Sequence, residues 1–188
     1  GLHANGYSLV RSLIAEWDLE LTRPYQEQLM ATLGSEACAA AIAAEPQHAL
    51  ATLGEVLLAP TRIYAGPVLA VRRALRDAGH DLAGIAHVTG GGLPGNVPRA
   101  LPAGLAARLD PLAWRMPSVL RLFGALGGLA DEELRAVFNG GLGMTVVVAP
   151  AAVGPAIEAF AGEGLEAAVV GRVVEAGGGA RYEEGALA

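Results

Sequence analysis

The chain has 188 residues, a net charge of −6 and a mean hydropathy of +0.40, and aromatic residues make up only 5% of it. This length suits one domain over residues 1–188, with a core that must consist mainly of Ala, Val, Leu and Ile. The acidic balance argues against a nucleic-acid-binding protein, and no apolar run approaches the ~18 residues that a membrane-spanning helix requires.

All thirteen basic residues are arginines, so the chain has no lysine for a Schiff base or for a phosphate-binding lysine motif. Its single cysteine, Cys38, allows neither an internal disulfide nor a Cys-x-x-Cys metal site, which is typical of the reducing cytoplasm. None of the four histidines has the spacing of helical metal ligands, so no metal site is predicted. His48 and His80 are interpreted as surface residues.

The first half of the chain is predicted to be mainly helical. Asn5 is placed to cap a helix over residues 6–17. Residues 26–44, bracketed by prolines, are compatible with one Ala-rich helix or with two short ones. A further helix is expected over residues 67–78, with a proline in its first turn and a glycine just past its end.

The second half combines helices with short strands. The expected elements are a strand at 85–88, a helix to residue 101, a strand at 106–109, helices at 117–126 and 131–138, the second capped by Asp131, a strand at 144–149, a helix after Val153 and a strand at 169–174. This order favours an α+β fold, a small mixed sheet layered with helices, over a doubly wound fold.

Three consecutive glycines, Gly90 to Gly92, follow an apolar run and precede a segment that can be helical. Glycines accept positive φ and carry no Cβ, and peptide N–H groups at a strand-to-helix turn are anion donors. Asn96 and Arg99 share one helical face, from which both could reach a ligand on the turn. The turn is therefore either a phosphate cradle or a tight connection that needs glycine for steric reasons alone.

Two further turns are rich in glycine and asparagine. His3 and Asn5 lie between glycines just before a helix whose N-terminus could hold an anion, and residues 139–143 form either another wall of a cleft or a simple corner. Ser8 lacks the Gly-x-Ser-x-Gly context of a serine hydrolase. The residues alone therefore indicate a domain with three such turns, with anion donors, and without a self-sufficient acid–base pair.

Four segments in this order carry a family resemblance: GLHANGYSLVR at 1–11, LLAPTRIY at 57–64, HVTGGG at 87–92 followed by Asn96, Pro98 and Arg99, and FNGGLGM at 138–144. They resemble the C-terminal domain of phosphoribosylformylglycinamidine cyclo-ligase, or aminoimidazole ribonucleotide (AIR) synthetase, over essentially the whole chain. Residues 18–50 are longer than is usual in that family, so the resemblance does not support their structure, and they are interpreted as a helical insertion.

The resemblance implies the fifth step of de novo purine biosynthesis. In that step ATP activates the formyl amide oxygen of formylglycinamidine ribonucleotide, and a ring nitrogen closes onto the same carbon to give AIR, ADP and phosphate. It also implies an N-terminal domain, absent from this chain, that carries most of the ATP and Mg²⁺ binding and forms the homodimer. The chain alone is expected to be inactive. Two alternatives stay open: a related enzyme of the formylglycinamidine ribonucleotide synthetase type, and a non-catalytic phosphate-binding module.

Carried over to this chain, the resemblance assigns roles to residues of the three turns. His3 and Asn5 are the catalytic candidates, and His3 is expected to contact the reacting amide or the transferred phosphoryl group, where a charged donor would stabilise developing charge. The candidates for binding substrate and phosphate are Ser8, Thr89, Gly90, Gly91, Gly92, Asn96, Arg99, Asn139 and Gly141.

Overall fold

The computed structural model describes residues 2–3 and 5–187. Their contacts form two compact units, which are described separately below. Unit 1 comprises Gly1–Thr61, Thr89–Gly92 and Met116–Gly141, and unit 2 comprises Arg62–Val88, Leu93–Arg115 and Leu142–Ala188. That residues 1–188 form one domain stays a prediction. No helix in the described part of the chain is long and apolar enough to cross a membrane.

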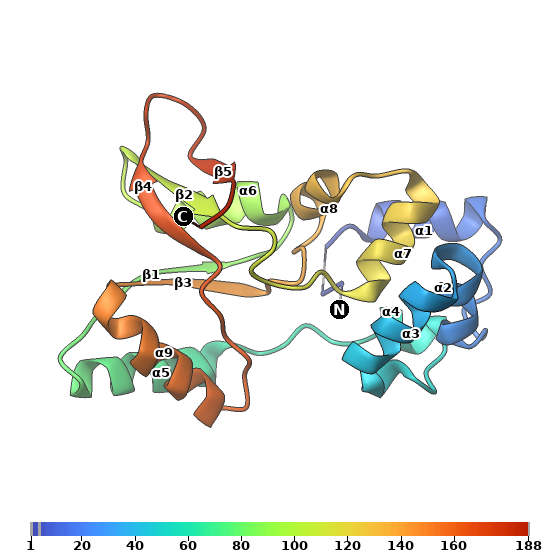
Figure 1. Ribbon diagram of the computed structural model, residues 1–188, viewed down its shortest axis with the longest axis horizontal. Helices are drawn as coiled ribbons and strands as arrows, with labels where there is room; N and C mark the ends of the chain where they lie inside the picture. The colour runs from blue at the N-terminus through green and yellow to red at the C-terminus, as the bar shows by residue number, and fades with distance from the viewer. Residues whose placement is uncertain (1, 4, 188) are drawn as a thin grey trace. The chain divides into compact units, whose positions relative to one another are not determined.

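Unit 1 is helical (Figure 1). Its helices are α1 (Tyr7–Glu16), α2 (Tyr25–Leu33), α3 (Ser35–Ala44), the 3₁₀ helix η1 (Pro46–His48), α4 (Leu53–Leu57), α7 (Ser118–Gly127) and α8 (Asp131–Val137). The Ala-rich segment forms two helices because Gly34, at φ 87°, ends α2 before α3 begins. Residues 18–50 are therefore largely helical, and that they are an insertion stays a prediction.

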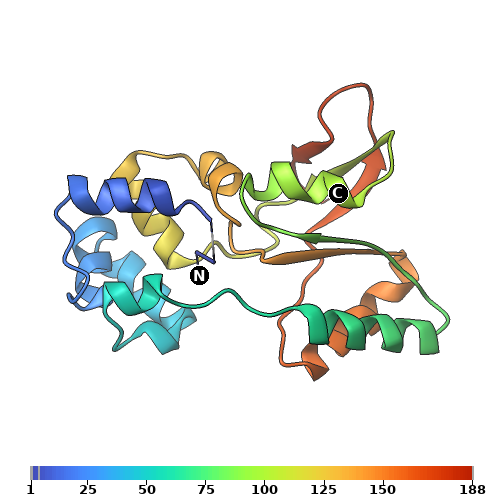
Figure 2. The ribbon, with the colours of Figure 1, turned by 180° about the vertical axis from the view of Figure 1, so that it is seen from behind.

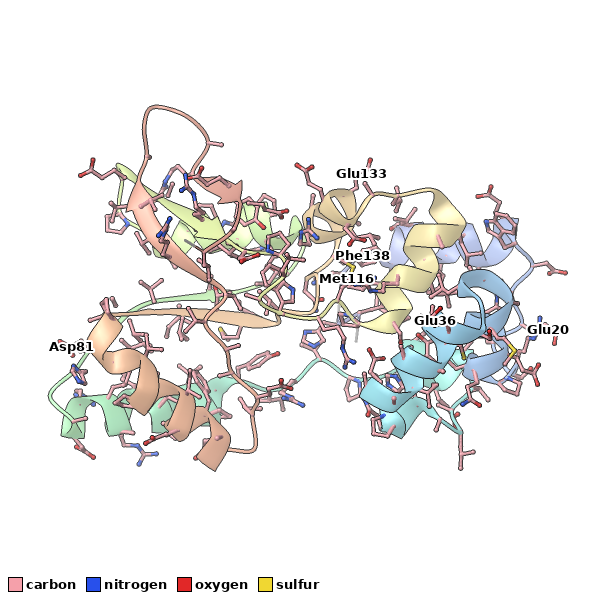
Figure 3. All side chains as sticks on the ribbon, in the orientation of Figure 1. Glu20, Glu36, Asp81, Met116, Glu133 and Phe138 are labelled. Atoms are coloured by element: carbon pink, nitrogen blue, oxygen red, sulfur yellow. The ribbon has the colours of Figure 1, made fainter. Side chains whose placement is uncertain are left out.

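The core of unit 1 joins these helices through aliphatic and aromatic side chains. Tyr25 and Leu29 of α2 are fully buried with Phe123 of α7, and Met116 and Phe138, which are labelled in Figure 3, belong to the same cluster. Residues 18–50, whose structure the resemblance does not support, thus supply part of the core that holds α7 and α8 in place.

A carboxylate from a distant part of unit 1 caps the N-terminus of α7. The helix follows Pro117, whose side chain cannot accept a hydrogen bond, so its first N–H groups need another partner. Ser118 donates two hydrogen bonds to Glu45, from its backbone N to Oε1 at 2.9 Å and from its Oγ to Oε2 at 2.6 Å. Glu45 is 9% exposed, so its carboxylate fixes α7 against the start of η1 from within the unit.

Two aromatic side chains complete this buried network. The Tyr25 hydroxyl lies 2.8 Å from Ser118 Oγ, and burial raises the pKa of Tyr25, so the phenol stays neutral and can donate. His48 Nδ1 lies 3.1 Å from Glu45 Oε2, and its ring meets Tyr25 edge-on with centroids 5.8 Å apart. The interpretation of His48 as a surface residue is therefore wrong: its side chain is only 16% exposed, because it packs into this network.

Unit 2 contains both sheets. Its elements are α5 (Ala65–Asp77), β1 (Leu82–His87), α6 (Gly92–Asn96, of which Gly92 belongs to unit 1), the 3₁₀ helix η2 (Val97–Ala100), β2 (Leu105–Leu109), β3 (Met144–Val148), the 3₁₀ helix η3 (Pro150–Ala152), α9 (Val153–Gly162), β4 (Gly171–Glu175) and β5 (Tyr182–Glu184). β1 and β3 form an antiparallel pair. β2 is the centre of a mixed sheet, antiparallel to β4 and parallel to β5.

β3 packs against hydrophobic clusters on both of its faces. Helices α5 and α9 lie side by side along one face, as both ribbon views show (Figures 1 and 2), and bury Val71 and Phe160 against Val146 and Val148. Val147 points to the opposite face, into a cluster that includes Leu93 and residues of β2. This period of two is that of a strand with packing on both faces, and the five residues of β3 are half-buried. The α+β class, with a small mixed sheet layered with helices, is confirmed.

The structure corrects two local predictions and adds a strand. The helix after the glycines does not run to residue 101: it is α-helical only to Asn96 and then 3₁₀, because Pro98 has no N–H to continue the α-helical pattern. Asp131 is not an N-cap, since Ala130 holds that position and donates its N–H to Glu133 Oε2 at 2.8 Å. β5 was not expected, because three residues are too few to show a period of two.

Replacing Glu45 by alanine is expected to lower the free energy of unfolding by about 2–3 kcal/mol, because it leaves the buried N–H and Oγ of Ser118 without their acceptor. Urea unfolding of the chain measures the change. Glu36→Ala is the control, since Glu36 lies exposed in the first turn of α3 (Figure 3) and its loss should change stability by about 0.5 kcal/mol or less. Equal effects of the two substitutions would contradict the capping role.

Candidate functional site

Three of the predicted turns meet in unit 1 at the C-terminal end of α8. The loop before α1, the triple glycine and the corner after α8 each place a glycine against residues 135–138. A Cβ at Gly6 would overlap the ring of Phe138, and one at Gly92 would overlap the carbonyl oxygen of Arg135. Because these approaches leave no room for a side chain, glycine is what allows the three turns to come together.

The loop before α1 is held at both ends. Leu2 is buried in the core of unit 1, and Gly6, at φ 67°, directs the chain into α1 beneath Phe138. Between them His3 is half-buried with a left-handed backbone, φ 54°, and Asn5 is only 2% exposed. Such conformations in non-glycine residues are uncommon and are concentrated at functional sites.

Asn5 does not cap α1, contrary to the sequence prediction. Gly6 is the N-cap residue, and α1 begins at Tyr7. Asn5 instead lies one residue earlier, in a turn in which its N–H donates to Leu2 O at 3.3 Å. Ser8 lies exposed in the first turn of α1, next to Tyr7, whose hydroxyl donates to Leu57 O at 2.6 Å and so fixes the start of α1 to the second motif.

The triple glycine forms a tight turn. Gly92 donates its N–H to Thr89 O at 3.0 Å, and Gly91 and Gly92 both have positive φ, 89° and 57°. Gly90 and Gly91 are exposed, whereas Gly92 is buried against α8. Glycine is therefore required sterically at Gly92, whereas phosphate binding by the exposed Gly90 and Gly91 stays a prediction.

The corner after α8 is built by a side chain. Asn139 is 1% exposed, and its Oδ1 accepts a hydrogen bond from Gly141 N at 2.9 Å, an Asx turn. Gly140 and Gly141 follow with φ of 59° and 103°. Asn139 thus shapes this corner through the oxygen of its side-chain amide, and its part in binding substrate stays a prediction.

Asn96 and Arg99 belong to unit 2, whereas the other predicted site residues belong to unit 1. Asn96 is 3% exposed and accepts a hydrogen bond at Oδ1 from Arg99 Nη1 at 3.5 Å, so the two residues are neighbours as their spacing predicted. Arg99 is exposed, and its Nε and Nη2 have no partner among the described residues.

A histidine and a tyrosine from two different motifs also meet in unit 2. The ring of His87, the last residue of β1, lies edge-on to that of Tyr64 with centroids 5.7 Å apart. Burial raises the pKa of Tyr64, against the opposing charge of Arg62, so the phenol stays protonated at neutral pH. His87 is exposed at the end of β1.

These motifs agree with comparisons to known proteins. Residues 1–183 match the family described as AIR synthase related protein, C-terminal domain. The chain belongs to this family. It is 42% identical over 177 residues to a protein named phosphoribosylformylglycinamidine cyclo-ligase from Sorangium cellulosum, and 39% identical over 178 residues to one of the same name from Thermosynechococcus vestitus. These alignments cover 94% and 95% of the chain but only 44% and 45% of the two relatives.

One residue of this AIR synthase-related domain escaped the sequence analysis. Arg135 in the last turn of α8 is 8% exposed, its carbonyl oxygen meets Gly92, and its Cγ would lie 2.8 Å from a Cβ at Gly140. From the sequence, an arginine four residues after the acidic start of a helix is expected on a solvent-exposed face. Arg135 is buried instead because two glycine turns pack on it. The sequence signal for Arg135 was indirect: the glycines at 92 and 140 indicate close contacts, and Arg135 is the residue that they contact.

A cavity in unit 1 lies away from these turns. Its volume is about 840 Å³, and it lies between the end of α1, the start of α2 and the end of α7, with Trp17, Arg23 and Gln28 among its lining residues. None of the predicted site residues lines it. The described residues also include no group of three or more His, Cys, Asp or Glu side chains that could hold a metal ion. The candidate site therefore rests on the converging turns.

Replacing Gly92 by alanine is expected to lower the free energy of unfolding by about 3 kcal/mol, from the left-handed backbone and the overlap with Arg135 O together. Gly90→Ala in the same turn is the control. Gly90 has no positive φ, and no described atom lies within 4 Å of the added Cβ, so a change of about 1 kcal/mol or less is expected. Urea unfolding measures both, and a tolerated Gly92→Ala would contradict the packing of the turn on α8.

Proposed function

We propose that this chain is the C-terminal part of an ATP-dependent cyclo-ligase that closes the ring of formylglycinamidine ribonucleotide to AIR in purine biosynthesis. The observation that carries the proposal is the convergence of three motif turns on residues 135–140 of unit 1. The names of the two relatives support the same reaction class. Backbone donors in exposed glycines suit a phosphorylated substrate, since they present N–H groups without steric cost.

In this proposal the loop before α1 serves the reacting groups. ATP transfers a phosphoryl group to the formyl amide oxygen, a ring nitrogen attacks the carbon, and the carbon–oxygen bond breaks to release phosphate. His3 would donate to the charge that develops on the phosphoryl group or the amide, a role that preorganised donors fill in such transfers. Asn5, buried beside it, would orient the same group, and Ser8 would add a hydroxyl at the start of α1.

The remaining candidates would hold phosphate and shape the site. Thr89, Gly90 and Gly91 would donate to the phosphate, and Gly92 keeps their turn against α8. Asn139 and Gly141 shape the opposite corner by their Asx turn. In unit 2, Asn96 and Arg99 would bind a phosphate group of the substrate or of ATP, for which the unengaged N–H groups of Arg99 are suited.

ATP, Mg²⁺ and the partner domain are part of the proposal. The described residues group no three potential metal ligands, so Mg²⁺ would be held with ATP by the remainder of the protein. That remainder corresponds to the more than half of each relative that the chain does not match, and it would also form the homodimer. A cytoplasmic location, with no nucleic acid and no membrane as partner, is proposed with this function.

A chimera tests the proposal. The matching region of the Sorangium cellulosum cyclo-ligase is replaced by this chain, and AIR formation is measured in purified protein and in bacteria that lack AIR synthetase. The chimera is expected to be active, and His3→Ala in it to lower kcat by roughly 100-fold or more, as removal of a preorganised donor does. Ser12→Ala is the control, since Ser12 is exposed on α1 and should leave kcat unchanged.

Each other outcome identifies an alternative. An inactive but folded chimera that still binds ribose 5-phosphate would favour a non-catalytic phosphate-binding module. Activity on formylglycinamide ribonucleotide with an ammonia donor, and none in ring closure, would favour an enzyme of the formylglycinamidine ribonucleotide synthetase type. Full activity of the His3→Ala chimera would remove His3 from the site.

The 188-residue chain by itself is expected to form no AIR and no ADP from formylglycinamidine ribonucleotide and MgATP, because the proposal assigns most ATP and Mg²⁺ binding to the rest of the protein. Chromatography of the reaction mixture detects both products. The active chimera serves as the positive control under the same conditions. Product formation by the chain alone would contradict this division of roles.

A further inference from the structure

Arg181 forms hydrogen bonds to four backbone carbonyl groups within residues 98–105. Three carbonyl oxygens share the two N–H groups of Arg181 Nη2, Pro98 O at 3.0 Å, Leu101 O at 2.6 Å and Pro102 O at 2.9 Å, and Nε donates to Leu105 O at 3.0 Å. All five residues belong to unit 2. Among the described residues Arg181 forms no ion pair, so its charge is directed entirely at these carbonyls.

The segment that Arg181 binds, residues 98–105, has few backbone hydrogen bonds within itself. η2 is a single 3₁₀ turn, and the last carbonyls of such a turn have no partner further along the helix. Its own bonds are few: Leu101 N donates to Pro98 O at 3.1 Å, and Leu105 N donates to Pro102 O at 3.3 Å. Of the four carbonyls that Arg181 binds, Pro98 O lies in η2, and the other three lie in the residues that follow it. The guanidinium therefore ties the end of η2 to these residues, where a cation also interacts favourably with the helix dipole.

Arg181 is itself anchored by the mixed sheet. Its carbonyl oxygen accepts a hydrogen bond from Ala107 N of β2 at 2.9 Å, and Tyr182, the next residue, pairs with Ala107 where β5 runs parallel to β2. The guanidinium therefore extends from a fixed strand to the end of η2. Its planar fork is suited to several acceptors at once, which an ammonium group on a flexible stem is not.

Arg99 lies inside the braced turn, between two of the carbonyl groups that Arg181 binds. We propose that Arg181 is a positioning residue for phosphate binding: it holds the η2 backbone so that Arg99, bonded to Asn96, presents its remaining N–H groups to an anion. This inference rests on the proposed function, which assigns phosphate binding to Arg99. The ligand class is a phosphate monoester such as the ribose 5-phosphate portion of a nucleotide.

An NMR titration of the chain with ribose 5-phosphate tests the proposal, because it measures weak binding residue by residue. Arg181→Gln is expected to weaken binding about as much as Arg99→Ala does, roughly 10-fold. The double substitution should be no weaker than Arg99→Ala alone, because Arg181 acts through Arg99. Arg108→Gln is the matched control: Arg108 of β2 pairs with Glu183 at 3.1 Å and touches none of the four carbonyls.

Amide hydrogen exchange at Leu101 and Leu105 provides a readout that needs no ligand. Both amides donate within the braced segment, so Arg181→Gln is expected to speed their exchange at least about 10-fold, and Arg108→Gln to leave it unchanged. Arg181→Lys, which keeps the charge without the fork, should fall between Arg181→Gln and the unsubstituted chain in both measurements.

The outcomes separate the positioning role from the phosphate site. Faster exchange with unchanged affinity in Arg181→Gln would overturn the positioning role and leave a purely structural brace. Additive losses in the double substitution would also overturn it, because Arg181 would then contact the ligand itself. Equal affinity of Arg99→Ala and the unsubstituted chain would instead overturn the phosphate site of the proposed function, whatever the exchange rates are.

Discussion

The backbone of Gly92 lies against the carbonyl oxygen of Arg135 more closely than any side chain would permit, and the arrangement of unit 1 around α8 depends on such approaches. Gly6 meets Phe138 in the same way one turn further along, and the buried Asn139 then folds the chain back through its bond to Gly141. Three separate segments each place a glycine against the end of α8. The conformations of the three turns therefore depend on the same short helix end. A site composed of these turns is therefore rigid where it contacts α8 and exposed at Gly90 and Gly91.

A second constraint of the same kind operates in unit 2. η2 carries Arg99, and the guanidinium of Arg181, just before β5, adds hydrogen bonds to its end from some eighty residues away. In unit 1 the carboxylate of Glu45 does the same for the N-terminus of α7. In both places a charged side chain completes a helix end that its own sequence leaves uncapped, which couples local order to the tertiary fold.

Much of the candidate site could be predicted because short motifs record local requirements. The glycines at 90–92 and 140–141 and the residues His3 and Asn5 were recognisable from their types and spacing, and the adjacency of Asn96 and Arg99 followed from a helical repeat. Asn5 was misread as a cap, because its type suits that position and the chain does not reveal that Gly6 takes it. Arg135, Arg181 and Glu45 were missed, since each acts on a segment that is distant in sequence.

The sequence by itself determined the α+β class, most of the helices and strands, the family, and the chemical character of the three turns. These properties follow from periodicity, turn residues and ordered motifs, all of which are local in the chain. Only the tertiary structure decided that Gly92 is a packing residue while Gly90 and Gly91 face solvent, that His48 joins a buried network, and that Arg181 braces η2. The physical reason is that burial and hydrogen-bond partners across long separations are set by how the elements pack, and no local pattern encodes them.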